Sequence, residues 1–356
     1  MSTQTAKILM KGNEVMCEAA VRAGCKFFAG YPITPQNEVP EYLSWRLPQA
    51  GGVFVQAESE IAAINMIFGA AATGFRCMTS SSSPGISLKQ EGISYIAAAE
   101  LPCVIANVQR GGPGLGNIRA AQSDYFQAVK GGGHGDYHLI VLAPSTLTEL
   151  YALTMNAFDY ADHYRNPVMI LMDGILGQMV EPIVTEEYRP LFEPTEKDYI
   201  LDGCKGRKPR IIKTLHLQPA EALVEVNRRL VAKYKRISSE LKLCEDFQTD
   251  DARLIVSAYG ITAQVSKGAV LQARSKGLKV GLIRPITLWP FPEAPFVKAA
   301  QTAEKFLVVE MSNGQMIEDV RLAEQCLRPV EFFGVGGGWY PTTDEVLDAI
   351  EKSYPA

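Results

Sequence analysis

Residues 25–38 read CKFFAGYPITPQNE, in which a short apolar run changes abruptly into a loop stiffened by Pro32 and Pro35. The run Cys25–Ala29 predicts a strand that is buried on both faces, because it is apolar without strict alternation. The prolines restrict φ on both sides of Thr34 and so hold its hydroxyl in one place. The alternative interpretation is a rigid connection in which Thr34 caps a short following helix.

The same succession of strand and helix repeats along the first half of the chain. This alternation indicates βαβ units and a mainly parallel sheet. The other expected strands are Val53–Gln56, Phe75–Thr79, Pro102–Val108, His138–Ala143 and Pro167–Met172, and the expected helices are Asn13–Ala23, Glu60–Ala72, Gly92–Ala99 and Thr146–Tyr164.

The character of the chain changes near Thr185. Residues 191–249 are rich in charge, and the amphipathic stretch Pro219–Leu243 predicts a connector with a surface helix. We therefore expect an α/β protein with a parallel-sheet domain at residues 1–190 and a smaller α/β domain at residues 250–356. Strands of the second domain are expected at Leu254–Ala258, Val280–Ile283, Phe306–Glu310 and Val330–Val335, with helices at Thr262–Ser275, Pro295–Ala303 and Gln315–Cys326.

Composition excludes several classes of protein. The 356 residues are 47% hydrophobic and 21% charged with a net charge of −4, which is typical of a soluble globular protein and argues against nucleic-acid binding. No apolar run approaches the roughly 20 residues needed to cross a membrane, and Met1–Lys11 lacks the pattern of a signal peptide, so we expect a cytoplasmic protein. The seven cysteines form no C-x-x-C pair, so we expect reduced thiols and no metal or cluster site in this chain.

Unusual residues follow the predicted strands, where ligands of open α/β sheets collect. Glu60 comes directly after one strand and opens an apolar helix that contains the small residues Ala62, Ala63, Gly69 and Ala70. One interpretation is a carboxylate that interacts with the helix dipole. The other is a buried carboxylate that binds a ring system packed against the small residues.

Arg110 follows another strand and precedes the glycine-rich run Gly111–Gly116. An arginine in this place can bind a carboxylate through two hydrogen bonds, and the glycines allow a ligand or another chain to approach closely. The run lacks the spacing of a Walker or Rossmann loop. An exposed glycine loop with an incidental arginine is the alternative.

Two further polar loops are candidates. The serine run Ser80–Ser83 precedes Pro84-Gly85, and the loop Gly131–Asp136 contains His134. His134 is suited to donate to a substrate oxyanion, but a histidine in a glycine-rich loop is as often simply solvated. Both interpretations stay open.

Three of these segments closely resemble the alpha subunit of the 2-oxoacid:ferredoxin oxidoreductase family. They are GYPITPQNE at Gly30–Glu38, the glutamate segment Gln56–Gly69 and VQRGGPGLG at Val108–Gly116. The resemblance covers nearly the whole chain. It implies that residues 1–190 form a pyrimidine-type thiamine-diphosphate-binding domain and that residues 250–356 form a domain like the C-terminal domain of transketolase, with a mainly architectural role.

The resemblance also implies roles for residues. Glu60 would bond the pyrimidine N1′ of the cofactor, Thr34 would lie at the substrate and the thiazolium, and Arg110 would bind the 2-oxoacid carboxylate. Further cofactor contacts are expected from Tyr31, Pro32, Ile33 and Ser83, and further substrate contacts from Gly114, Leu115 and His134.

The reaction implied by the resemblance is oxidative decarboxylation of a 2-oxoacid to acyl-CoA and CO2, with coenzyme A as co-substrate and electrons passed to ferredoxin. The chain has neither cluster cysteines nor the Gly-Asp-Gly start of the magnesium–diphosphate motif. Mg²⁺ and the [4Fe–4S] clusters would therefore lie on partner subunits, namely beta, gamma and a ferredoxin-like delta subunit. The chain would be active only in such a hetero-oligomer.

The substrate is expected to be a branched-chain 2-oxoacid, 3-methyl-2-oxobutanoate. Residues 111–137 resemble that type of enzyme, and Leu115 in the substrate loop favours an apolar tail. The same chemistry on 2-oxoglutarate or pyruvate is the alternative. Two other classes are a non-redox thiamine diphosphate enzyme and a non-catalytic scaffold, and the intact set Thr34, Glu60 and Arg110 argues against the scaffold.

Overall fold

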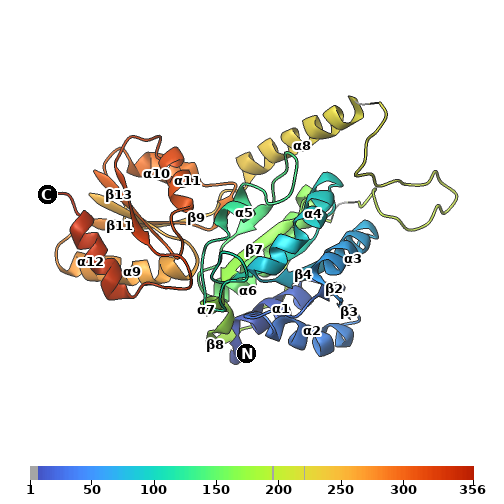
Figure 1. Cartoon of the computed structure of the whole chain (residues 1–356), viewed down its shortest axis with the longest axis horizontal. Coiled ribbons are helices and arrows are strands. Elements are labelled where there is room, and N and C mark those ends of the chain that lie inside the picture. Colours follow the sequence, from blue (N-terminus) through green and yellow to red (C-terminus); the bar gives the residue numbers. More distant parts are fainter. Residues whose placement is uncertain (1–6, 195, 220) are drawn as a thin grey trace, which may run out of the picture.

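A computed structural model describes residues 7–194, 196–219 and 221–356, which form two sheet domains that lie side by side (Figure 1). Of the segment Met1–Lys11, in which no signal peptide is expected, residues 1–6 lie outside the described residues. Within the described ranges, no helix combines the length and the apolar character needed to span a bilayer.

The first domain is built on a seven-stranded sheet in the order β12-β6-β7-β5-β4-β2-β3. Six strands are parallel, and β12 pairs antiparallel with β6 at one edge. The strands are β2 (Phe27–Gly30), β3 (Val53–Gln56), β4 (Cys77–Ser81), β5 (Val104–Gln109), β6 (Ile140–Leu142), β7 (Val168–Asp173) and β12 (Thr287–Trp289).

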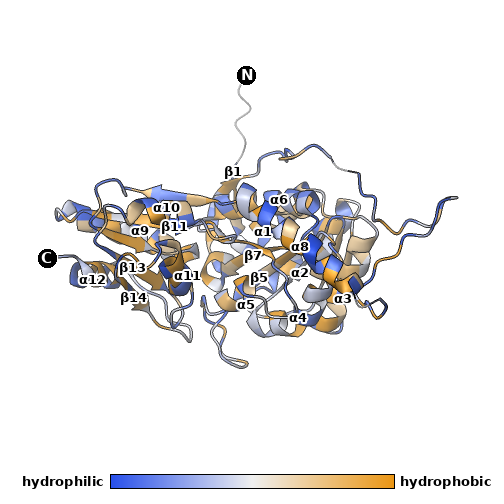
Figure 2. Cartoon of the chain, turned by 90° about the horizontal axis from the view of Figure 1, so that it is seen from above, coloured by the Kyte–Doolittle hydropathy of each residue, from blue (hydrophilic) through white to orange (hydrophobic). Residues whose placement is uncertain are grey.

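Helices cover this sheet because parallel strands require crossover connections. Hydrophobic residues are concentrated on the central strands and on the inner faces of the helices (Figure 2). Helix α1 packs against α6, and α3 packs against α4. The helices are α1 (Gly12–Arg22), α2 (Glu38–Gln49), α3 (Glu60–Ala72), α4 (Ser83–Ala98), α5 (Tyr125–Val129), α6 (Leu147–Tyr164) and α7 (Gly174–Gln178).

The predicted parallel sheet is confirmed. Strand β3 and helix α3 have the predicted bounds, and the other predicted strands shift by one or two residues. The predicted start of α4 at Gly92 is wrong, because the helix begins at Ser83. Pro84 is tolerated there since the first turn of a helix has no use for its missing N–H, so the serine run ends in a helix and not in a long loop.

The second domain has a five-stranded sheet in the order β14-β13-β10-β11-β9, in which only β9 is antiparallel. The predicted strands and helices are present, and α12 is an additional helix that packs on α9. The elements are β9 (Cys244–Phe247), β10 (Leu254–Ser257), α9 (Gly260–Ser275), β11 (Val280–Pro285), α10 (Glu293–Ala299), β13 (Lys305–Glu310), α11 (Met316–Ala323), β14 (Val330–Gly334) and α12 (Thr343–Ser353).

The remaining elements lie beside the first sheet or pack against it. Strands β1 (Lys7–Lys11) and β8 (Val180–Val184) form an antiparallel pair beside the first sheet. The predicted connector helix is confirmed as α8 (Glu221–Glu240), which buries one face of its C-terminal half. Its Tyr234 ring lies edge-on to Trp289 of β12 at 5.7 Å. Strand β12, which follows β11 of the second domain along the chain, pairs with β6 and so completes the sheet of the first domain.

Candidate functional site

The sheet order brings the candidate residues together. Strands β5, β4, β2 and β3 are neighbours, and the carboxyl ends of parallel strands share one edge. Thr34 follows β2, Glu60 opens the helix after β3, Ser83 opens the helix after β4, and Arg110 follows β5. Residues that are up to 76 positions apart in sequence, such as Thr34 and Arg110, are therefore in contact.

Glu60 is a buried carboxylate. It is the first residue of α3, where the Ser59 side chain caps the helix by accepting from the Ala62 N–H at 3.1 Å. Only 6% of Glu60 is exposed, and no hydrogen bond to its carboxylate is found among the described residues. A buried carboxylate without a donor is costly, so this position is suited to a ligand that brings an N–H or O–H group.

Gly85 in the first turn of α4 makes room for Glu60. A Cβ atom at Gly85 would lie 2.6 Å from Glu60 Oε1 and 2.1 Å from Ser81 Oγ. Only glycine therefore allows the helix backbone to approach the carboxylate this closely. Because Gly85 has no side chain, the Glu60 carboxylate can occupy its position at the carboxyl ends of the strands.

Several other polar atoms at this edge are buried without a hydrogen-bond partner in the described structure. The Ser80 hydroxyl donates to Gln36 Oε1 at 2.5 Å, which brings the loop after β2 against the end of β4. The atoms without partners at the ends of β4 and β5 and in this loop are Ser81 Oγ, Ser82 Oγ, Gln36 Nε2, Asn107 Oδ1 and Gln109 Nε2. Such a mixture of unpaired donors and acceptors fits a flat polar ring that offers both kinds of group.

The loop that contains Thr34 is held from outside. The Pro35 carbonyl accepts from Asn13 Nδ2 and from Gln178 Nε2, each at 2.9 Å. The Thr34 carbonyl accepts from Arg110 Nη1 at 2.9 Å. The Thr34 hydroxyl oxygen lies 3.5 Å from the donating Asn37 amide, so its own proton is free for another acceptor.

Arg110 joins two loops of the site. Its Nη1 donates to the Thr34 carbonyl and its Nη2 donates to the Leu115 carbonyl, both at 2.9 Å. The side chain is buried, and its Nε has no partner among the described residues. A buried guanidinium N–H without an acceptor is suited to an anionic ligand such as a carboxylate.

The glycine-rich loop after Arg110 contacts the second domain. The Asn117 amide donates to the Gly337 carbonyl at 2.8 Å, and a Cβ atom at Gly338 would lie 2.7 Å from Arg119 Cβ. Leu115 at the tip of this loop is 79% exposed, and Gly114 beside it has a φ of +70°. The loop is therefore supported at its base while its tip is accessible.

Ser83 contacts Arg110 through the backbone. Its hydroxyl accepts from the Arg110 N–H at 3.0 Å and donates to Asp124 Oδ2 at 2.6 Å. Burial raises the pKa of Asp124, and its hydrogen bonds with Ser83 and Asn107 oppose this rise. Ser83 thus fixes the start of the Arg110 loop, and its contact with a cofactor stays a prediction.

The other predicted residues are more exposed or lie apart. Tyr31 and Pro32 are exposed at the start of the Thr34 loop, and Ile33 is half-buried. The His134 ring lies edge-on to Tyr95 of α4 at 6.4 Å. In the described part of the chain, no hydrogen bond joins His134 to the Thr34 and Arg110 cluster, and its role at the substrate stays a prediction.

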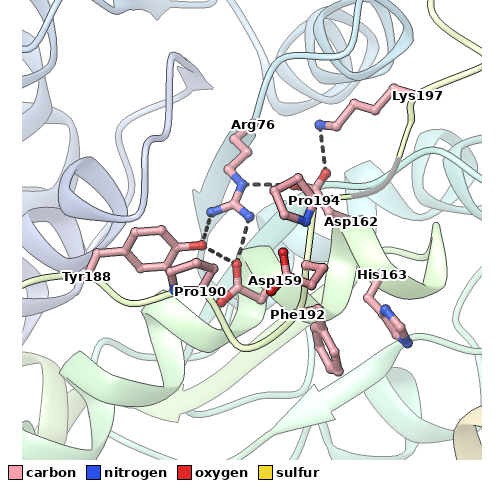
Figure 3. Close-up of a pocket in the computed structure, with 10 residues that line it drawn as sticks. Arg76, Asp159, Asp162, His163, Tyr188, Pro190, Phe192, Pro194 and Lys197 are labelled. Atoms are coloured by element: carbon pink, nitrogen blue, oxygen red, sulfur yellow. Dashed lines mark hydrogen bonds and ion pairs between the residues drawn. The ribbon is translucent and has the colours of Figure 1, made fainter.

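A cavity of about 270 Å³ lies at the amino ends of the strands, where β4 begins and α6 ends (Figure 3). Arg76 donates to Asp159 at 2.7 Å and to Asp162 at 2.8 Å, and Lys197 pairs with Asp162 at 2.8 Å. The Leu191 N–H donates to Asp159 at 3.0 Å. These paired charges fasten the segment after β8 to α6, and we assign this cavity a structural role.

Two residues near the site were not singled out from the sequence, Asp124 and Lys89, and Gly85 was named only as part of the serine loop. Lys89 is fully buried on α4. Gly85, Lys89 and Gly92 are spaced four and three residues apart, so they share one face of this helix. A lysine on an otherwise small and apolar helix face is the sequence signal that could have identified it.

Two protein families match most of the chain. The family described as pyruvate flavodoxin/ferredoxin oxidoreductase, thiamine diP-binding, matches residues 18–243. The family described as pyruvate:ferredoxin oxidoreductase core domain II matches residues 252–346.

Curated relatives match over nearly their full length. Ketoisovalerate oxidoreductase subunit VorB of Methanothermobacter thermautotrophicus is 48% identical over 352 residues, which cover 99% of this chain and 97% of that protein. The 2-oxoglutarate synthase subunit KorA of the same organism is 37% identical over 373 residues, which cover 98% and 99%.

Solved structures show the same architecture. The 2-oxoglutarate:ferredoxin oxidoreductase from Magnetococcus marinus, with 2-oxoglutarate, coenzyme A and succinyl-CoA bound, superposes with a TM-score of 0.87 at 28% identity. The match covers 98% of this chain and 65% of that one. A split-gene transketolase, an inactive beta4 tetramer, superposes with a TM-score of 0.61 at 13% identity over 97% of this chain and 98% of that one, and this likeness concerns the fold alone.

Proposed function

Since this chain belongs to the 2-oxoacid:ferredoxin oxidoreductase family, we propose that it is the alpha subunit that holds the aminopyrimidine of thiamine diphosphate in a CoA-acylating enzyme. The observation that supports this most directly is the buried Glu60 carboxylate, which has no partner among the described residues and packs on Gly85. Its surroundings fit an aminopyrimidine, because the unpaired Ser81, Ser82 and Gln36 atoms match a ring with donors and acceptors.

Each site residue then has a chemical role. Glu60 would form a hydrogen bond with the pyrimidine N1′ and exchange a proton with it. Thiamine diphosphate would supply, when bound, a carbon nucleophile for the keto carbon. The Thr34 hydroxyl, whose proton is free, donates to the reacting oxygen, and the unpaired Arg110 Nε binds the 2-oxoacid carboxylate. Because Arg110 also holds the Thr34 and Leu115 carbonyls, the residue that binds the carboxylate also positions both loops.

The proposed substrate is the branched-chain acid 3-methyl-2-oxobutanoate. The relative named ketoisovalerate oxidoreductase subunit is 48% identical, whereas the 2-oxoglutarate synthase subunit is 37% identical. Leu115, exposed at the tip of the loop Gly111–Gly116, offers an apolar surface for the branched tail of the substrate. The same chemistry on 2-oxoglutarate is the second candidate.

The remaining parts of the active site come from partner subunits. We propose a beta subunit that binds the diphosphate, Mg²⁺ and a [4Fe–4S] cluster, a gamma subunit and a ferredoxin-like delta subunit, with external ferredoxin as acceptor and coenzyme A as co-substrate. The relatives' names, which call them subunits, support a multi-subunit enzyme. We propose a cytoplasmic location for this assembly.

The test is a steady-state assay of the purified complex with coenzyme A and a viologen acceptor. We expect kcat/KM to be highest for 3-methyl-2-oxobutanoate, compared with 2-oxoglutarate and pyruvate. A preference for 2-oxoglutarate would refute the substrate, and decarboxylation without reduction of the viologen would refute the redox chemistry.

Glu60→Gln tests the site itself. It should nearly abolish turnover while the complex assembles normally, because a neutral amide cannot exchange a proton with N1′. Glu58→Gln is the matched control, since Glu58 is an exposed glutamate two residues earlier. Equal rates for both variants would remove Glu60 from the site.

A further inference from the structure

Lys89 is a buried cation that the reaction described above does not use. Its side chain is fully buried, and its Nζ donates to Thr79 Oγ1 at 2.5 Å and to the Ser80 carbonyl at 3.1 Å. The Thr79 hydroxyl in turn donates to the Ala29 carbonyl at 2.7 Å. No carboxylate lies within 4 Å of Nζ in the described structure, so Lys89 forms no direct ion pair there.

The position of Lys89 relates it to Glu60. Lys89 is one helical turn after Gly85, the residue whose backbone packs against the Glu60 carboxylate. One turn further along the same face, a Cβ atom at Gly92 would lie 2.5 Å from the Ile64 side chain of α3. This face of α4 therefore packs along the start of α3.

Strand β4 connects the two charged groups. Lys89 Nζ binds Thr79 and Ser80, and the next residue, Ser81, lies against the same point of Gly85 as the Glu60 carboxylate. The lysine thus lies on the interior side of the carboxylate, at the end of the same strand.

The charges around Lys89 are few. Burial lowers its pKa to about 7, and the Glu60 carboxylate is the largest opposing influence. The second opposing influence is Cys103, but burial raises the pKa of that thiol to about 12, so it is neutral. Among the described residues, Glu60 is therefore the charged group that raises the pKa of Lys89 against the effect of burial.

A structural role alone does not explain this residue. Burying an ammonium group without an ion pair costs stability, and an unbranched apolar side chain of similar length would fill the same space without that cost. A buried charge beside the site, with a pKa shifted by burial, is the pattern expected of a functional group.

We propose that Lys89 is a positioning residue for Glu60, whose positive charge stabilises the Glu60 carboxylate from the interior side and so favours transfer of its proton to the pyrimidine N1′. The inference rests on the proposed function of Glu60. Helix α4 then takes part in the chemistry through the charge of Lys89, which does not touch the cofactor.

The test compares the wild-type complex with Lys89→Met, a variant with a similar chain length and no charge. Lys89→Met should assemble with an unchanged or higher Tm, and its kcat at pH 6 should fall by about tenfold, which corresponds to about 1.4 kcal/mol. The wild-type kcat should decline as the pH rises through 7, where Lys89 loses its proton. The variant should lack this decline, so that the two rates converge at pH 8.

A second readout does not depend on turnover. Calorimetric titration of the cofactor-depleted complex with thiamine diphosphate and Mg²⁺ should give a Kd that is severalfold weaker for Lys89→Met at pH 6 and equal to wild type at pH 8. The matched control is Lys233→Met. Lys233 on α8 is nearly buried, lies 3.8 Å from Glu100, and has its pKa lowered to about 8 by burial, but it is remote from the site. Lys233→Met should leave both the pH profile of kcat and the cofactor Kd at wild-type values.

The outcomes separate the hypotheses. A Lys89→Met complex with the wild-type pH profile and cofactor affinity would overturn the inference while leaving the proposed function intact. If the wild-type complex turned over no 2-oxoacid, the proposed function itself would be refuted. Should Lys89→Met not assemble, Lys89→Gln takes its place, because it keeps a donor for Thr79 and Ser80. Failure of both variants to assemble would overturn the inference in favour of a structural role.

Discussion

Gly85→Ala is a small change that should disable the site without harming the fold. The new Cβ atom would lie 2.6 Å from Glu60 Oε1, 2.9 Å from Glu60 Cγ and 2.1 Å from Ser81 Oγ. Ordinary contact begins at 3.4 Å, so the Glu60 oxygen must retreat by about 0.8 Å (3.4 − 2.6) and the Ser81 hydroxyl by about 1.3 Å (3.4 − 2.1). The hydroxyl can rotate away at little cost because it has no hydrogen bond to lose.

Glu60 cannot adjust as easily, because its Cγ atom is also too close to the new methyl group. A displacement of about 1 Å at a reacting group can cost about 10²-fold in rate. We therefore expect kcat of Gly85→Ala to fall by about 10²-fold. Stability should change little, since alanine is favoured over glycine in a helix by up to about 1 kcal/mol, which offsets the strain of the contact.

The assay is 2-oxoacid-dependent reduction of a viologen by the purified complex, with Tm measured on the same preparation. Gly69→Ala is the matched control, because Gly69 is an exposed helical glycine in α3 and a Cβ atom added to it would meet no other atom within 4 Å. That variant should keep the wild-type kcat. A folded Gly85→Ala complex with wild-type kcat and KM would refute the assignment of this pocket to the chemistry.

The remaining predictions concern binding and stability. Arg110→Ala should raise KM for the 2-oxoacid by about 10- to 100-fold with a smaller effect on kcat, since hydrogen bonds to charged groups contribute about 1.5–3 kcal/mol, and an unchanged KM would place Arg110 in the fold alone. Asn117→Ala removes the bond to Gly337 and should raise the same KM severalfold; steady-state kinetics with no change would mean that the second domain does not support the loop. Burial raises the pKa of Asp173 to about 6 in the folded protein, from 3.8, so its contribution to stability is complete below about pH 4 and is lost as the pH rises through 6. Asp173→Asn should abolish this part of the decline in stability, an effect of about 3 kcal/mol at most, and parallel pH slopes of Tm for the two proteins would contradict it.

The sequence was sufficient where the controlling forces are local. A short apolar run predicts β3 and an apolar helical stretch predicts α3, both at their observed bounds, because local sequence determines which backbone conformation buries these side chains. The loops with Thr34 and Arg110 also stand out, because prolines and glycines restrict or free the backbone wherever they occur. Once the strands are predicted as parallel, their carboxyl ends must share an edge, and so the association of Thr34, Glu60 and Arg110 was predictable.

Only the tertiary structure decided what surrounds these residues. The burial of Lys89, the contact of Gly85 with Glu60 and the bond from Asn117 to Gly337 join segments that are distant in sequence. The placement of β12 in the first sheet is of the same kind. Spacing along the chain determines which face a residue occupies, whereas the partner across that face depends on how whole helices and strands pack against one another. The site residues were therefore predictable, but the buried charge of Lys89 and the close contact of Gly85 with Glu60 were not.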